Sequence, residues 1–201
     1  MSRAIDVLMN EHQVILSVLG SLENYVGQIQ QGATLDRSLL GDYVDFFRNF
    51  ADKCHHGKEE ELLFRIMNDH GFSNDQGPLA VMLFEHVQGR NHVQALAAIA
   101  AGTGPVGPPD QMQAIQHALS FIPLLRNHIG KEDRILYPMA LQAIPDLEMD
   151  QLHGAFESFE TNVMGSETHA QFQRLAEKLV AAYPPAQNSE TGQCAHFCHH
   201  T

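Results

Sequence analysis

Apolar residues recur at the spacing of an α-helix along most of the chain, in four long segments separated by short breaks. Asp36 is placed to cap the start of the second segment, and Pro78 stands in the first turn of the third. No stretch has the character of a β-strand. The predicted helices cover roughly residues 3–31, 35–69, 77–101 and 110–143. Long amphipathic helices joined by short breaks predict an all-α, up-and-down four-helix bundle.

The rest of the chain is predicted to form an extension and a tail. Beyond Pro145 the apolar spacing indicates one or two additional helices. We therefore expect a bundle at residues 1–145, a C-terminal helical extension packed on the bundle at 146–183, and a flexible tail at 184–201. The stretch Cys194–His200 of this tail contains two cysteines and three histidines. It is either a metal-capture or redox segment or a disordered end, and the sequence leaves both interpretations open.

An internal repeat lies within this helical pattern. Residues 55–64 read HHGKEEELLF, and residues 128–137 read HIGKEDRILY. The two stretches align without gaps and share the pattern His-x-Gly-Lys-Glu-acid, followed after one position by an apolar residue, leucine and an aromatic residue. They fall on the second and fourth predicted helices, which are diagonally opposite in an up-and-down bundle.

Helical spacing selects the same two positions in each copy of the repeat. At about 100° per residue, His55 and Glu59 fall inside the apolar stripe of the second helix. His128 and Glu132 fall inside the corresponding stripe of the fourth helix. The residues expected on a solvated face instead are His56, Glu60 and Glu61.

The first and third helices each add one histidine in an apolar setting, His12 and His86. A single histidine on an apolar face is usually an ordinary core residue, but two repeated His-x-x-x-Glu units beside two more histidines favour a metal site. Buried carboxylates also require a cation nearby. The predicted ligands are His12 and His55 for one metal ion, His86 and His128 for the other, and Glu59 and Glu132 as bridges. Such mixed ligands fit iron best, and manganese or zinc less well.

Composition narrows the classes of partner and compartment. The chain has 201 residues and a formal net charge of −12, without a basic block, which argues against nucleic acid or an anionic membrane as a main partner. No signal peptide and no membrane span are predicted from the apolar runs. Three cysteines do not suggest a disulfide framework, so a cytoplasmic location is expected.

At these residues the sequence resembles the hemerythrin-like, or HHE cation-binding, family. The resemblance is carried by Glu11-His12, by the two repeat copies and by Glu85–Arg90, and it covers about residues 4–143. It implies an up-and-down bundle around a non-haem di-iron centre bridged by an oxo or hydroxo group and by carboxylates. The family pattern places the ligands at His12, His55, Glu59, His86, His128 and Glu132, the residues that helical spacing selects independently.

The sequence departs from the oxygen carriers of this family at two positions. Those carriers have a second histidine on the third helix, where this chain has Arg90, and their last carboxylate aligns with Asp133 rather than Glu132. The chain is more similar to the subgroup that includes iron-sensing and iron–sulfur-repair proteins. Loss of a histidine is expected to open a coordination position and to make the two irons more alike. Reversible oxygen carriage is therefore less expected than redox reactivity.

Three residues close to the predicted site have competing interpretations. Arg90 either bonds a bridging carboxylate or an iron-bound anion, or it lies in a surface ion pair. Cys54 is expected to be a small buried thiol. Tyr137 is expected to pack in the core, although a phenolate ligand is the alternative.

The predicted function is a di-iron, metal-binding protein that binds or reacts with O2, peroxide or nitric oxide. The alternatives are a di-iron oxidoreductase acting on a small substrate, and an iron-storage or iron-sensing module. The expected partner is a small diatomic molecule or a peroxide, with no nucleic acid and no membrane, and the chain is a monomer or a homodimer. Whether the protein is an enzyme stays undecided at this point.

Overall fold

The computed structural model describes residues 2–165 and 168–186, and every regular element within these ranges is helical. The α-helices are α1 (Arg3–Gln30), α2 (Arg37–Phe46), α3 (Phe64–Asp69), α4 (Gly77–Ala100), α5 (Pro108–Lys131), α6 (Tyr137–Ala143), α7 (Asp146–Phe159) and α8 (Thr168–Ala182). Wider π-helical turns form η1 (Phe47–His56), η2 (Glu59–Leu63), η3 (Glu132–Leu136) and η4 (Glu160–Met164). None of the helices in the described ranges is long and apolar enough to cross a bilayer.

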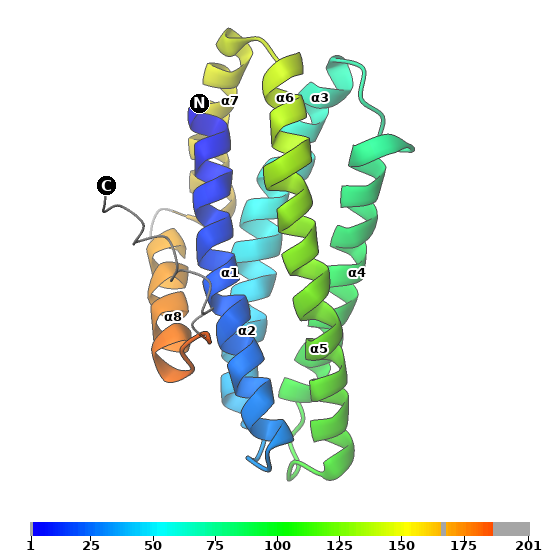
Figure 1. Ribbon diagram of the computed structural model, residues 1–201. Helices are drawn as coiled ribbons and strands as arrows, with labels where there is room; N and C mark the ends of the chain where they lie inside the picture. The colour runs from blue at the N-terminus through cyan, green and yellow to red at the C-terminus, as the bar shows by residue number, and fades with distance from the viewer. Residues whose placement is uncertain (1, 166–167, 187–201) are drawn as a thin grey trace, which may run out of the picture.

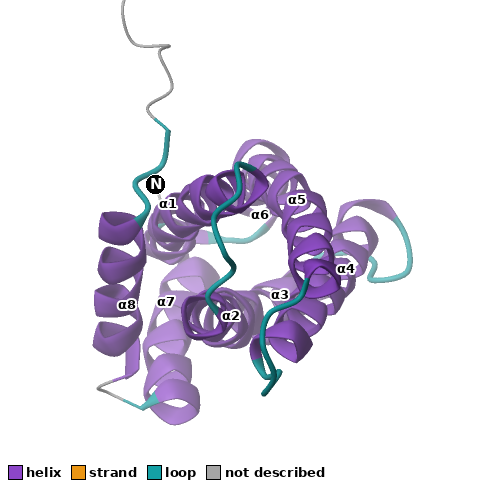
Figure 2. Cartoon of the chain, turned by 90° about the horizontal axis from the view of Figure 1, so that it is seen from below, coloured by secondary structure: helices purple, strands orange, loops and turns teal. Residues whose placement is uncertain are grey.

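Four antiparallel rods form the predicted bundle (Figures 1 and 2). The rods are α1, the run from α2 through η1 and η2 to α3, α4, and the run from α5 through η3 to α6. Helix α5 packs against both α1 and α4, and α2 packs against α4. The two rods that carry the internal repeat therefore lie diagonally across the bundle, and the all-α bundle prediction is confirmed.

Local sequence signals end the helices where the bundle turns. The carboxylate of Asp36 accepts hydrogen bonds from the backbone N–H groups of Ser38 at 2.8 Å and Leu39 at 3.2 Å, which confirms the predicted N-cap. Gly32, just beyond α1, has a φ of 106°, a left-handed conformation that suits glycine and turns the chain toward α2.

The bundle core consists of two apolar clusters with a polar layer between them. One cluster fills the end near the α1–α2 connection and includes Leu22, Phe46 and Phe121. The other fills the opposite end and includes Met67 and Leu136. The buried histidines and glutamates lie between these clusters, so that the polar layer is closed off by apolar residues along the bundle axis. Burial of that layer has to be compensated by mutual bonds or by a cation.

Helices α7 and α8 pack on one side of the bundle, against α1 and α2 (Figure 2). The hydroxyl of Ser21 on α1 donates to the backbone carbonyl of Leu179 on α8 at 2.8 Å. Asn24 donates to the carbonyl of Pro184 at 2.7 Å. The Cys194–His200 stretch, for which two interpretations were open, lies outside the described residues.

Candidate metal centre

Six buried side chains converge in the polar layer, and they are the six predicted ligands. None is more than 2% exposed. They come from α1, η1, η2, α4, α5 and η3, and they are His12, His55, Glu59, His86, His128 and Glu132. Three of the six stand on π-helical turns, which occur frequently at functional sites because the wider turn redirects side chains.

The ring nitrogens of the histidines point at one another and at the two carboxylates. His86 Nε2 and His128 Nε2 are 3.0 Å apart. Glu132 lies with one oxygen 3.0 Å from His128 Nε2 and with the other 3.3 Å from His12 Nε2. Glu59 Oε2 lies 3.5 Å from His86 Nε2 and 3.8 Å from His55 Nε2. Both carboxylates therefore reach histidines on two sides, as bridging ligands do.

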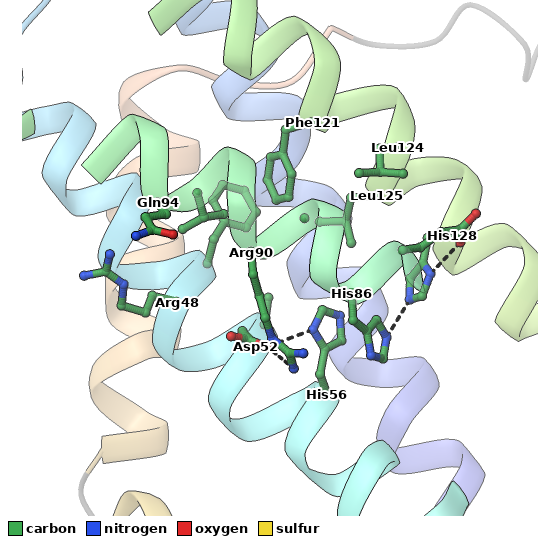
Figure 3. Close-up of a pocket in the computed structure, with 15 residues that line it drawn as sticks. Arg48, Asp52, His56, His86, Arg90, Gln94, Phe121, Leu124, Leu125 and His128 are labelled. Carbon is green, nitrogen blue, oxygen red and sulfur yellow. Dashed lines mark hydrogen bonds and ion pairs between the residues drawn. The ribbon is translucent and has the colours of Figure 1, made fainter. Parts of the chain in front are cut away.

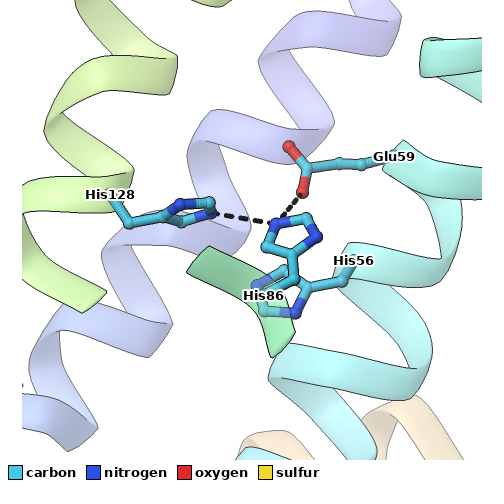
Figure 4. Close-up of side chains that lie close together, drawn as sticks. All are labelled: His56, Glu59, His86 and His128. Atoms are coloured by element: carbon cyan, nitrogen blue, oxygen red, sulfur yellow. Dashed lines mark hydrogen bonds and ion pairs between the residues drawn. The ribbon is translucent and has the colours of Figure 1, made fainter. Parts of the chain in front are cut away.

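The six predicted ligands and one further histidine, His56, form two overlapping groups. Within each group, one ligand atom of every residue lies within 4.8 Å of the ligand atoms of the others. The first group consists of His12, His55, Glu59 and Glu132. The second consists of His56, Glu59, His86 and His128, and Figure 4 shows these side chains close together, with His128 and Glu59 directed at His86. Glu59 belongs to both groups, so the two candidate metal positions are adjacent.

Several buried polar atoms in this layer have no hydrogen-bond partner among the described residues. They are His55 Nε2, Glu59 Oε2 and both carboxylate oxygens of Glu132. Leaving buried carboxylate oxygens unsatisfied is costly, since each loses its hydration without compensation. Neutral imidazole nitrogens and carboxylate oxygens are together the donor set that first-row transition metals take. The residues present therefore fit a pair of metal cations.

The pKa shifts of the buried groups also indicate that the two carboxylates require a nearby positive charge. Burial, together with repulsion from Glu132, raises the pKa of Glu59 to about 8. Burial disfavours the charged form of His128, but its contacts with Glu132 and Glu85 outweigh this and raise its pKa to about 10. In the absence of metal, protons therefore supply the positive charge that the carboxylates require.

Each of the four predicted histidine ligands is held through its second ring nitrogen by a carboxylate. The Nδ1–oxygen pairs are His12 with Asp133 at 2.7 Å, His55 with Glu11 at 2.8 Å, His86 with Glu60 at 2.6 Å and His128 with Glu85 at 2.9 Å. Such a bond fixes the ring and leaves Nε2 directed at the centre, an arrangement typical of metal-binding histidines.

The internal repeat generates two matching halves around these histidines. Lys58 bonds the second oxygen of Glu11, and Lys131 bonds the second oxygen of Glu85. We define the His12 half as His12, His55, Glu11, Lys58 and Asp133, and the His86 half as His86, His128, Glu85, Lys131 and Glu60. The lysine of each repeat copy thus bonds the glutamate that precedes the histidine on the neighbouring helix.

The comparison with known proteins agrees with this geometry. The family described as "Hemerythrin HHE cation binding domain" matches residues 3–140. The chain belongs to this hemerythrin family. Its buried histidine and glutamate clusters suit a metal-binding protein, as the family description implies.

Curated relatives of this hemerythrin-like chain add no functional description. Similar proteins, each named only as uncharacterized, come from Mycobacterium bovis and from two strains of Mycobacterium tuberculosis. Each is 22% identical over 173 residues, which is 86% of this chain and 66% of the relative's length. This chain thus spans slightly less than two thirds of those proteins. No solved structure matches.

Two of the residues expected on a solvated face, His56 and Glu60, take part in the polar layer instead. The side chain of Glu60 is 25% exposed and accepts from both His86 and Arg90, so its interpretation as a solvent-facing charge was wrong. His56 is only 7% exposed, and its outward assignment was also wrong. It ends the π-helical segment η1, whose wider turns rotate its side chain inward relative to an α-helix. Glu61 is exposed as expected.

Arg90 forms ion pairs, which was one of its two expected roles, and its side chain is 38% exposed. It donates to Asp52 at 2.8 Å and to Glu60 at 2.7 Å, and these carboxylates in turn bond His56 and His86. Arg90 therefore braces histidines through carboxylates rather than touching Glu59 or Glu132. Helical spacing did not predict the Asp52 and Glu60 carboxylates as partners of buried histidines, because it does not show which residues of another rod lie opposite a polar side chain, nor that His56 turns inward.

A cavity of about 300 Å³ opens beside the second candidate metal group (Figure 3). His56, His86 and His128 form its inner end, where Figure 3 shows them side by side. Its apolar wall includes Phe121 and Leu125. The cavity provides an approach to the His86 half from outside the bundle.

Two further residues behave as the sequence predicted. Cys54 is buried, and burial raises the pKa of its thiol to about 12, so it stays protonated and packs as a small side chain. Tyr137 is buried in the core, and its hydroxyl donates to Glu59 Oε1 at 2.7 Å. This hydrogen bond fixes the orientation of the carboxylate that both groups share.

Proposed function

We propose that this chain binds two iron ions in its polar layer and that this centre binds or reacts with O2, peroxide or nitric oxide. The proposed ligands are His12 and His55 for one ion, His86 and His128 for the other, and Glu59 and Glu132 for both. The observation that carries the proposal is a set of buried carboxylate and imidazole atoms without hydrogen-bond partners, in a chain of a cation-binding family. Bound iron would supply the change of oxidation state that such small molecules require.

The protein's own residues would hold this centre in place. The carboxylates on the Nδ1 atoms fix the orientation of the four histidines and raise their basicity as ligands. Lys58 and Lys131 neutralise two of these carboxylates, which limits the negative charge around the centre. Apolar clusters above and below keep bulk water away, so that the ligand geometry is set by packing rather than by solvent.

A second candidate function is an oxidoreductase that acts on a small organic molecule. The cavity of about 300 Å³ favours it, because the volume greatly exceeds the roughly 30 Å³ that one water molecule occupies in the liquid. A binding protein for a diatomic gas does not require so much space. Both candidates use the same metal centre.

One experiment tests the proposal and separates binding of the small molecule from its turnover. The chain is purified without oxygen, reconstituted with ferrous iron, analysed for metal content and exposed to O2 or hydrogen peroxide under a spectrophotometer. We expect about two irons per chain, by the count of ligand groups. A reversible charge-transfer band supports ligand binding, and consumption of peroxide over many cycles supports an enzyme. A chain that takes up no metal contradicts the proposal, and a Glu132→Ala chain serves as the metal-deficient control.

A further inference from the structure

His56 is a buried histidine without a counterpart in the internal repeat. The equivalent position in the second copy is Ile129. His56 is 7% exposed and stands at the inner end of the cavity, next to His86 and His128. An apolar residue would satisfy the packing at this position, as Ile129 does in the other copy. The presence of an imidazole there calls for a separate explanation.

The surroundings of His56 copy those of the four histidines already described. Its Nδ1 atom lies 3.2 Å from Asp52 Oδ1, and Asp52 is fixed in turn by Arg90 at 2.8 Å. The repeat alignment matches Asp52 with Leu125, and alignment of the Glu11-His12 and Glu85-His86 pairs matches Arg90 with Leu16. A unit of three polar residues has therefore been added to one half alone. Its effect is to hold a fifth imidazole in the orientation that ligating histidines take.

The free nitrogen of His56 faces the second candidate metal group. The His56 ring stacks on His86 with ring centres 3.8 Å apart and an angle of 19° between the planes (Figure 4). One His56 nitrogen lies within 4.8 Å of ligand atoms of Glu59, His86 and His128. Because Nδ1 bonds Asp52, Nε2 is the ring nitrogen left to bind a metal ion. Metal–nitrogen bonds of about 2.1 Å place ligands about 3 to 4 Å apart, which this cluster approaches.

We infer that His56 is a third histidine ligand of the metal ion bound between His86 and His128. The inference rests on the proposed function, because it assumes a metal pair in the polar layer. The oxygen carriers of the family have a second histidine on the third helix, at the position that Arg90 occupies on α4 in this chain. His56, which stands on η1, would supply the imidazole that is missing there. One ion then has three imidazole ligands and the other two, so the two ions differ. The ion with two imidazoles, in the His12 half, keeps the open coordination position for an external ligand.

The test is the metal content and the Mössbauer spectrum of anaerobically reconstituted protein, using ferrous iron alone as the probe. Wild-type protein is expected to hold about two irons in two distinguishable environments. The variant His56→Gln, which keeps a hydrogen-bonding side chain of similar size, is expected to hold about one. The matched control is His153→Gln on α7, which belongs to neither metal group and is expected to leave both irons in place.

A second variant separates ligation from packing. His56→Gly leaves a space, and added imidazole is expected to restore the second iron if the side chain acts only as a nitrogen donor. Two irons with an unchanged spectrum in His56→Gln would overturn the inference while leaving the proposed function intact. Loss of both irons from a variant with unchanged helical circular dichroism would also overturn it, because His56 does not belong to the His12 half. Failure of wild-type protein to bind any metal overturns both proposals.

Discussion

The two halves of the polar layer share one ligand pattern but have different surroundings. In both, a histidine and a lysine of the repeat bond the glutamate that precedes the histidine of a neighbouring helix. Lys58 is 0% exposed and is covered by Glu160 at 2.5 Å and by the Phe156 ring at 5.8 Å, both from the C-terminal extension. Lys131 is 34% exposed.

The His86 half differs by its access and by an additional imidazole. It borders the cavity and contains the His56–Asp52–Arg90 unit, for which the other half has only apolar equivalents. The repeat accounts for four of the six proposed ligands, whereas His56 and residues outside the repeat produce the differences in exposure and in imidazole content. Substitutions at equivalent positions should therefore have unequal effects.

The largest effect is expected where the two halves meet. Glu59 belongs to both metal groups, so Glu59→Ala should remove both metal ions, whereas His12→Ala should primarily remove the ion of its own half. Metal content after anaerobic reconstitution measures this difference. Glu61→Ala, an exposed neighbour, is the control and should keep both ions. Retention of two ions by Glu59→Ala would show that the shared carboxylate is misassigned.

The next largest effect is expected at the two lysines. Lys58→Met leaves the buried carboxylate of Glu11 without its cation, which costs about 3–5 kcal/mol of unfolding free energy. Lys131→Met removes a partly exposed pair with Glu85 and should cost about 1 kcal/mol or less. Urea denaturation of the metal-free chains measures both. Equal losses of unfolding free energy would mean that burial of Lys58 under the extension does not strengthen its ion pair with Glu11.

Equivalent glycines should also respond unequally. A Cβ added at Gly57 would lie 2.8 Å from Phe159 Cζ, so that Gly57→Ala pushes against the extension and should cost about 1–3 kcal/mol. At Gly130 the close atom is Nη2 of Arg134, an exposed and flexible side chain that can move aside. Gly130→Ala should be neutral or stabilise the helix by up to about 1 kcal/mol. Thermal melting of the two variants compares them, and a less stable Gly130→Ala chain would contradict this view.

The last effect concerns a property that both halves share. Burial disfavours the charged form of His12, but its hydrogen bond to Asp133 and the nearby charge of Glu132 raise its pKa to about 9, and the pKa of His128 is raised to about 10. Above pH 6.5, the ordinary pKa of histidine, the unfolded chain has released these protons while the folded chain keeps them. The metal-free protein should therefore lose stability as the pH rises from 6.5 to about 9.

Melting temperatures across that pH range measure the loss. The metal-loaded protein is the comparison, because metal holds the ligands deprotonated and should remove most of the slope. A metal-free chain whose melting temperature rises over the same range would contradict the proton assignment. A slope that survives metal loading would place the titrating groups outside the polar layer.

The sequence alone determined the bundle, the repeat and the six inward residues. Those features follow from periodicity, since a histidine and a glutamate four positions apart on an apolar stripe must face the core together. The N-cap at Asp36 and the buried state of Cys54 follow from equally local rules.

Only the tertiary structure decided which neighbours complete the layer. Glu60 bonds His86 through a contact between two rods, and helical spacing within one rod does not reveal such a contact. Asp52 bonds His56 within η1, but the sequence does not show that this pair turns inward. The inward direction of His56 depends on the π-helical turns of η1, which change the angle per residue on which the sequence argument relied. The burial of Lys58 depends on the docking of a distant extension, a long-range packing outcome that no local pattern specifies.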